Sequence, residues 1–271
     1  MKKVIKNIIK ILNNKLINFL SFFNLGNFLL NSFISSCLKR DILINHKDVE
    51  FKLSVPNGLC FWRAKTFSTK EPETLNWIDS FEKNSILWDI GCNIGLYSVY
   101  AAKKNHLVYG FEPSFFNLEV LARNININNL SEKISILPIA LNDTNKMSKL
   151  RLTSDVWGSA HSTFDKNYTG DGSIINEEIT YQTVGFSMDD LVKILNLPYP
   201  DNIKIDVDGI EHLILKGGKK ILSNAKSVLV ENSNNFFEQT EGTKNILKET
   251  GFKISDEVKI DTNFTNQIWK K

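Results

Sequence analysis

Apolar runs without a polar face alternate with helical patterns along most of the chain, and this alternation constrains the fold more than any other feature. Strands that are apolar on both sides are buried on both sides, which is typical of a parallel sheet covered by helices. The sequence therefore predicts an α/β fold with a Rossmann-like, doubly wound, mostly parallel sheet of about seven strands and an antiparallel edge strand. The expected strands are 85–90, 106–111, 134–141, 202–207, 227–230, 252–260 and 264–269, and the expected helices are 96–103, 114–128, 189–195, 210–222 and 236–250.

The remaining segments are arranged around this sheet. Residues 1–40 are predicted to form an amphipathic helical extension, 41–84 a small β/α lead-in, and 85–271 the main domain. An insertion at 144–186 breaks the alternation with short strand-like pieces around a loop rich in Gly, Ser, Asn and Asp. In the lead-in, 41–55 and 59–67 are predicted strands separated by the turn Pro56-Asn57-Gly58, and 71–81 is a predicted helix.

Residues 1–36 are apolar but are interrupted by asparagines, so they fall short of the ~18 apolar residues that a membrane span needs. Apolar residues recur here at helical spacing, with lysines on the other side. An accessory helix docked on the domain is the simpler interpretation. The alternative is a basic amphipathic helix that rests on an anionic membrane as a peripheral contact.

Charge and cysteine content narrow the class of protein. The net charge is only +3 and the lysines are scattered, so no nucleic-acid partner is expected. Cys37, Cys60 and Cys92 follow no metal-binding spacing and indicate a reducing, cytoplasmic location. Nothing in the composition predicts an oligomeric state.

The segment DIGCNIG, from Asp89 to Gly95, follows the first predicted strand of the sheet, where such folds bind ligands. The dinucleotide fingerprint would require glycine at 93 and 96, but Asn93 and Leu96 stand there. Glu112 ends the next strand, as does the acid that accepts ribose hydroxyls in adenosine-binding folds. Asp89 suits a cationic group, such as an α-amino group beside a sulfonium. Together these acids predict S-adenosylmethionine as the cofactor.

Several blocks in a fixed order strengthen this prediction: EPETLNWID, WDIGCNIGLYSVYAA, GFEPSFFNLEVLARNININ, ILPIALND, SMDDL, IKIDVDGIEHLILKGG and LVEN. In these blocks the chain resembles the FkbM-type methyltransferases, a Rossmann-like family that uses S-adenosylmethionine. The resemblance covers about 71–232 and implies that 85–271 is the methyltransferase domain, with the insertion facing the methyl acceptor. It also implies how the cofactor is contacted. Asp89, Gly91, Asn93 and Gly95 would surround the methionine end, and Glu112 would contact the ribose. Ala140 and Leu141 would lie near the adenine.

Acidic residues follow the last two parallel strands, and these are the candidates for chemistry. Asp206 ends one strand, and Glu231 and Asn232 lie at the end of the next. Two interpretations are open: the three residues bind Mg²⁺ and orient the acceptor, or Asp206 and Glu231 hydrogen-bond the backbone and the acceptor directly without a metal. His161, in the insertion, is a candidate general base because its ordinary pKa lies near neutrality.

The sequence thus predicts an S-adenosylmethionine-dependent methyltransferase that methylates a hydroxyl on a sugar, a glycan precursor or another secondary metabolite. The oxygen preference comes from the family resemblance and from the acid-rich site. The alternatives are an N-methyltransferase of the same fold, or a non-catalytic adenosine-binding partner subunit. Intact cofactor blocks and acids at two later strand ends argue against the non-catalytic alternative.

Overall fold

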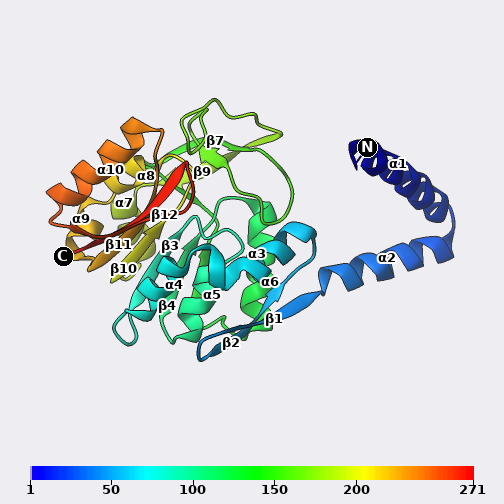
Figure 1. The fold of residues 1–271 in the computed structure, drawn as a ribbon, viewed down its shortest axis with the longest axis horizontal. Helices are drawn as coiled ribbons and strands as arrows, with labels where there is room; N and C mark the ends of the chain where they lie inside the picture. Colours follow the sequence, from blue (N-terminus) through cyan, green and yellow to red (C-terminus); the bar gives the residue numbers. More distant parts are fainter. Residues whose placement is uncertain (1) are drawn as a thin grey trace.

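The computed structural model describes residues 2–271 and is built on a seven-stranded sheet in the order β12-β13-β11-β10-β3-β4-β5 (Figure 1). β13 is antiparallel to both of its neighbours, β11 and β12, whereas the pairs from β11 to β5 are parallel. The predicted sheet is confirmed, but the antiparallel strand lies one place inside the edge. The strands are β3 (Ile86–Ile90), β4 (Leu107–Phe111), β5 (Ile134–Leu137), β10 (Asn202–Ile205), β11 (Ser227–Ser233), β12 (Lys253–Lys259) and β13 (Phe264–Lys270).

Helices cover both faces of the sheet, because alternate residues of each strand point to opposite faces. Leu87 and Leu229 belong to one hydrophobic cluster, whereas Ile90 and Val230 belong to the other. The first cluster includes buried residues of α3 (Gly58–Lys70), α4 (Pro72–Asp79), α5 (Leu96–Lys103) and α6 (Phe115–Ile127). The second includes residues of α7 (Met188–Leu195), α8 (Glu211–Lys216), α9 (Lys219–Asn224) and α10 (Phe237–Glu249).

The lead-in differs from the prediction at two places. Residues 41–55 form a hairpin of β1 (Asp41–His46) and β2 (Val49–Ser54), turning at Lys47 with a positive φ of 52°. A lysine in that conformation gives no turn signal in the sequence. The strand predicted at 59–67 is wrong, because this segment belongs to α3. Its buried residues Cys60, Ala64 and Phe67 are spaced as on one helical face, and the Asn57 side chain accepts a hydrogen bond from the Cys60 N–H.

Two predicted elements are each divided in the structure. Pro138 lies between β5 and β6 (Ala140–Leu141), so 134–141 contributes to two different sheets. Gly217 and Gly218 lie between α8 and α9, within the helix predicted at 210–222. The insertion forms a second sheet with β6, in the order β6-β9-β7-β8, from β7 (Lys146–Leu152), β8 (Ser162–Phe164) and β9 (Ile179–Phe186).

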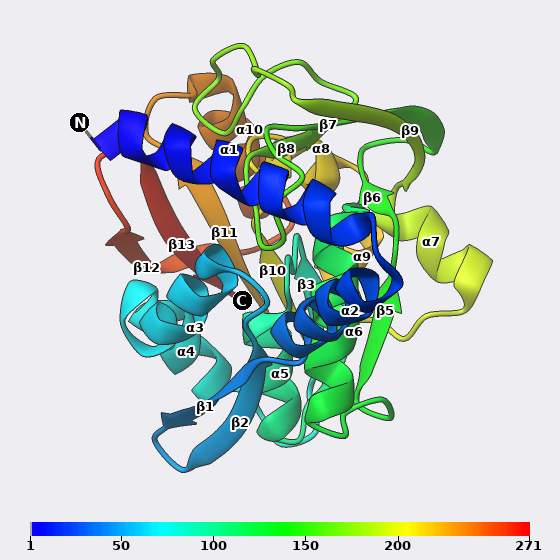
Figure 2. The same ribbon diagram turned by 90° about the vertical axis from the view of Figure 1, so that its right-hand side faces the viewer.

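At the N-terminus, α1 (Lys2–Ser21) and α2 (Asn24–Leu38) extend away from the domain (Figure 1), and in the second view they lie in front of it (Figure 2). Ile8 and Leu12 of α1 are 51% and 58% exposed. The interpretation of a helix docked on the domain is therefore wrong, because the apolar face of α1 is left open. None of the helices within residues 2–271 has the length and apolar character to cross a membrane.

Candidate active site

The turn after β3 lies at the point where the strand order reverses, between β3 and β10. Gly91 and Gly95 have positive φ values of 78° and 80°, which favour glycine. A Cβ atom on Gly91 would lie 1.9 Å from the carbonyl oxygen of Asp206, so only glycine fits there. Gly95 is the N-cap of α5 and packs against Leu121, where a Cβ would lie 2.3 Å from the leucine Cδ1. The close contact at Gly91 is therefore with Asp206, at the end of the neighbouring strand β10.

Asp89 is buried in β3 and carries an oxygen without a partner. Its Oδ2 accepts a hydrogen bond from the Ser98 hydroxyl at 2.6 Å, whereas its Oδ1 contacts no donor among residues 2–271. Burial raises the pKa of Asp89, and the ammonium of Lys204 partly offsets this effect. A buried acceptor without a donor is costly. A cationic group of a ligand would satisfy it, as the sequence predicts.

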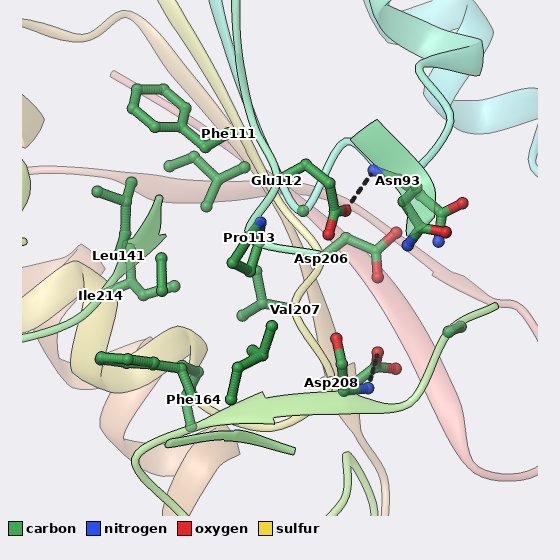
Figure 3. A pocket seen from close by; sticks show the side chains of 18 of the residues that line it. Asn93, Phe111, Glu112, Pro113, Leu141, Phe164, Asp206, Val207, Asp208 and Ile214 are labelled. Carbon is green, nitrogen blue, oxygen red and sulfur yellow. Dashed lines mark hydrogen bonds between the residues drawn. The ribbon is translucent and has the colours of Figure 1, made fainter. Parts of the chain in front are cut away.

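Glu112 follows β4 and is held by two backbone amides, of which that of Asn93 is seen in Figure 3. Its Oε2 accepts the Asn93 N–H at 2.9 Å, and its Oε1 accepts the Ser114 N–H at 2.8 Å. Burial raises the pKa of Glu112 to about 7, against the lowering effect of these hydrogen bonds. Each carboxylate oxygen has a second lone pair, so the group can still accept hydrogen bonds from ligand hydroxyls.

A first cavity of about 520 Å³ extends from Glu112 over an apolar floor. Figure 3 shows Phe111, Leu141, Phe164 and Ile214 on one side of it, and Glu112, Asp206 and Asp208 on the other. The predicted residues Gly91, Asn93, Glu112, Ala140 and Leu141 all line this cavity. One apolar half and one acidic end suit a nucleoside, with the base against the floor and the ribose at the acid.

Asn93 lines the cavity and also holds part of the insertion in place. Its side-chain amide donates to the carbonyl of Ser159 at 2.7 Å, and its side-chain oxygen accepts the Ile94 N–H. It therefore holds the insertion loop 157–162 against the turn. Asn117 of α6 does the same: it donates to the Ser159 carbonyl at 3.1 Å and accepts the Gly158 N–H at 3.0 Å.

A second cavity of about 500 Å³ shares Gly91, Asn93 and Asp206 with the first and is lined by charges of both signs. Its charged residues are Glu71, Asp89 and Asp206, together with Arg63, Lys70 and Lys204. An amino-acid group that carries both an ammonium and a carboxylate matches such a lining.

Lys204 is a site residue that the sequence analysis missed, as are Arg63 and Lys70. It lies beside Asp89 in the sheet register, is 2% exposed, and places its Nζ 2.7 Å from Asp206 Oδ2. Burial works to lower its pKa, but the carboxylates of Asp206, Asp89 and Glu71 outweigh this effect and raise it. Lys204 in turn lowers the pKa of Asp206 below its usual range, against the effect of burial. The signal in the sequence that could have revealed it is a charged residue between Ile203 and Ile205, in a strand that the structure shows to be fully buried.

A third, wider cleft of about 1150 Å³ joins the other two at Gly91, Asn93 and Asp206. Both predicted catalytic residues, Asp206 and His161, line it, and so do Asp208 and Glu231. Asp208 Oδ2 accepts the His161 backbone N–H at 2.7 Å, and Asp208 Oδ1 lies 3.5 Å from the ring Nδ1. The hydrogen bond and the charge of Asp208 raise the pKa of His161.

The predicted Mg²⁺ ligands do not form one site. Asp206 and Glu231 are neighbours, because they follow the paired residues Ile205 and Val230. Asn232 is one residue further, so its side chain points to the opposite face of the sheet and donates to Gln267 at 2.8 Å. Lys204 already pairs with Asp206. Within residues 2–271, no three or more His, Cys, Asp or Glu side chains have an arrangement that could hold a metal ion.

A doubly wound sheet with a cavity at its switch point that is apolar on one side and acidic on the other, next to a cavity with charges of both signs, defines a Rossmann-like α/β protein. Residues 89–254 match the sequence model of the methyltransferase FkbM domain. This match covers more than half of the chain, and the chain therefore belongs to the FkbM methyltransferase family.

Similar proteins include the hexuronic acid methyltransferase AglP of Haloferax volcanii, which is 27% identical over 184 residues. That alignment covers 63% of this chain and 65% of the relative, so it spans slightly less than two thirds of the relative's length. Among solved structures, the FkbM methyltransferase of Methylobacillus flagellatus is 16% identical, with a TM-score of 0.49 over 70% of this chain and 44% of that one. The magnesium protoporphyrin IX methyltransferase of Synechocystis is 11% identical, with a TM-score of 0.48 over 79% and 84%.

Proposed function

We propose that the protein is an S-adenosylmethionine-dependent methyltransferase that methylates an oxygen of a sugar or glycan precursor, with an acidic hexose as the first acceptor class to test. The observation that carries this proposal is the pair of joined cavities at the turn after β3. One matches an adenosine and contains Glu112, and the other matches an amino acid and contains the unpartnered Asp89 oxygen. Family membership and the hexuronic acid methyltransferase support it further.

The residues present fit this cofactor. Glu112 would accept the ribose hydroxyls, Ala140 and Leu141 would contact the adenine, and Asp89 would bind the ammonium beside the turn of Gly91 and Gly95. When bound, S-adenosylmethionine supplies an electrophilic methyl group. Methyl transfer then requires an oxygen nucleophile, held in line and relieved of its proton.

Two residues of the wide cleft are proposed to act on the proton of the acceptor hydroxyl. Asp206, kept ionised by Lys204, is proposed to accept a hydrogen bond from the acceptor hydroxyl and to orient it. His161, oriented by Asp208, is proposed to take the proton as general base. No metal is assigned to this step, because Lys204 already pairs with Asp206 and the third predicted ligand, Asn232, is bound to Gln267.

Calorimetric titration with S-adenosylmethionine tests the proposal, with NAD as the competing cofactor. We expect micromolar binding, about −8 kcal/mol, with NAD producing no heat. Glu112→Ala should abolish most of the heat, whereas Glu119→Ala should not, because Glu119 lies on the surface in an ion pair with Arg123. Absence of binding by the wild-type protein would refute the proposal. Binding without methylation of any sugar or amine would favour the non-catalytic alternative.

We also propose that α1 and α2 make a peripheral contact with an anionic membrane. Large apolar residues along both helices are exposed, including Phe22 at 84% and Phe28 at 68%. Residues 1–40 contain no acidic residue, and their basic residues are Lys2, Lys3, Lys6, Lys10, Lys15, Lys39 and Arg40. Apolar residues combined with positive charge suit the surface of an anionic bilayer.

A further inference from the structure

Arg63 of α3 stands at the boundary between the second cavity and the wide cleft and lines both. Its Nε donates to the carbonyl of Gly158 at 2.6 Å. This bond fixes one edge of the guanidinium against the insertion loop. The terminal nitrogens Nη1 and Nη2 make no hydrogen bond or ion pair with any residue in 2–271, although guanidinium groups in partly buried sites are usually paired.

The other two cations of the second cavity differ from Arg63 in this respect. Lys70 pairs with Glu71 at 2.7 Å, and Lys204 pairs with Asp206 at 2.7 Å. Each lysine thus has an internal carboxylate. Among the described residues that line this cavity, Arg63 is the cation whose charge is left for something outside the chain.

We infer that Arg63 binds a carboxylate of a bound ligand, through the two terminal nitrogens of its guanidinium. The inference rests on the proposed function, because it concerns the ligands of the same site. Two sources of this chemistry meet at the boundary: the methionine carboxylate of the cofactor, and a carboxylate carried by an acidic sugar acceptor. A planar fork that is anchored through Nε is already oriented for two parallel hydrogen bonds to a carboxylate.

The cofactor source is tested by titrating S-adenosylmethionine and its decarboxylated analogue into the wild-type protein and Arg63→Gln. If Arg63 binds the methionine carboxylate, Arg63→Gln should lose roughly tenfold or more in affinity for S-adenosylmethionine. The same substitution should leave the affinity for the decarboxylated analogue nearly unchanged. Arg63→Lys keeps the charge but loses the planar fork, so its affinity for S-adenosylmethionine should lie between those of the wild-type protein and Arg63→Gln.

The acceptor source is tested by methyl transfer to methyl glucuronide and to the matching neutral methyl glucoside. If Arg63 binds the acceptor carboxylate, Arg63→Gln should raise the KM for the glucuronide roughly tenfold or more, with kcat less affected. The KM for the neutral glucoside and the affinity for S-adenosylmethionine should remain as in the wild-type protein.

Two control variants separate carboxylate binding from other effects. Lys65→Gln removes the same charge from α3, but Lys65 lies over the ring of Phe61 and lines neither cavity. Asn117→Ala loosens the loop that Arg63 anchors, so any loss caused by loop mobility should affect S-adenosylmethionine and its decarboxylated analogue alike.

The inference is overturned if Arg63→Gln keeps the wild-type affinity for S-adenosylmethionine and the glucuronide is either not turned over or turned over with an unchanged KM. A loss that Lys65→Gln reproduces, or one equal for both cofactors and both sugars, overturns it as well. Failure of the proposed function has a different signature, because the wild-type protein itself would then bind no S-adenosylmethionine, and the inference would fall with it.

Discussion

Glu112 is buried and accepts two backbone hydrogen bonds, and these two features have opposite effects on the pKa of its carboxyl group. Burial raises the pKa of its carboxyl to about 7, while the amides of Asn93 and Ser114 hold the charged form in place. The group is therefore close to half ionised at neutral pH in the ligand-free protein. Hydroxyl donors of a ribose would stabilise the ionised form further, so ligand binding should lower this pKa.

The consequence is a pH dependence of cofactor affinity. Below pH 7, binding has to release the proton of Glu112, so the affinity for S-adenosylmethionine should fall by up to about tenfold for each pH unit. Above pH 7 the affinity should level off. Glu112→Gln should bind weakly and lose the inflection near pH 7, whereas Glu119→Gln should retain it. Calorimetry between pH 5.5 and about 8.5 would measure the profile, and a flat wild-type curve would contradict the assignment of Glu112 to the ribose.

At the scale of elements, the loop 157–162 lines the candidate site and is held there by hydrogen bonds from several parts of the fold. Asn93 and Asn117 hold Ser159, Arg63 and Asn117 hold Gly158, and Asp208 holds the amide of His161. The loop has little regular structure of its own, so its position depends on these side chains.

Asn117→Ala should therefore loosen the loop without unfolding the domain. It removes two hydrogen bonds, each contributing about 1 kcal/mol, so the free energy of unfolding should fall by roughly 2 kcal/mol. Limited proteolysis should then cut within 157–162 faster than in the wild-type protein. Asn126→Ala on the same helix has no side-chain bond to the loop and serves as the control. Equal proteolysis of both variants would show that Asn117 does not hold the loop.

The elements also show how far the sequence could lead. The parallel strands and most helices were predictable because apolar runs and helical spacing report burial on two faces or one. The acids Asp89, Glu112 and Asp206 were predictable because strand ends at the switch point are fixed by topology. Lys204 was missed although a charged residue inside an apolar strand was a visible signal, and Asn232 was misplaced because its partner depends on which face of the sheet its side chain points to. The helix at 58–70 was missed because its short apolar spacing also fits a strand.

At the scale of the whole molecule, α1 and α2 give the domain an extended apolar and basic arm. Arg123 of α6 donates to the carbonyl of Leu38, which ties the end of α2 to the domain. Together with the chain continuing into β1, this tie would transmit any membrane contact of the arm to the domain.

Vesicle sedimentation would test the membrane contact. The full chain should bind vesicles that contain phosphatidylglycerol and not vesicles of phosphatidylcholine alone, and added salt should weaken binding. Ile8→Asp together with Leu12→Asp should reduce binding at least about tenfold, because two apolar side chains no longer enter the bilayer. Asn7→Asp with Asn14→Asp makes the same change of charge without loss of apolar surface, and should reduce binding less. Equal losses in the two variants would argue against insertion of the apolar face.

The close approach between Gly91 and the carbonyl of Asp206 has a consequence for how the site can vary. The two strand ends meet there without room for a single methyl group, so the spacing between the turn after β3 and Asp206 depends on glycine at position 91. Any residue other than glycine at position 91 would force these strand ends apart. Under the proposed function, a change of acceptor is therefore expected to come from the other residues that line the wide cleft, in the insertion and in 260–264. New acceptors are therefore to be sought by substitutions in the insertion and in 260–264, with Gly91 left unchanged.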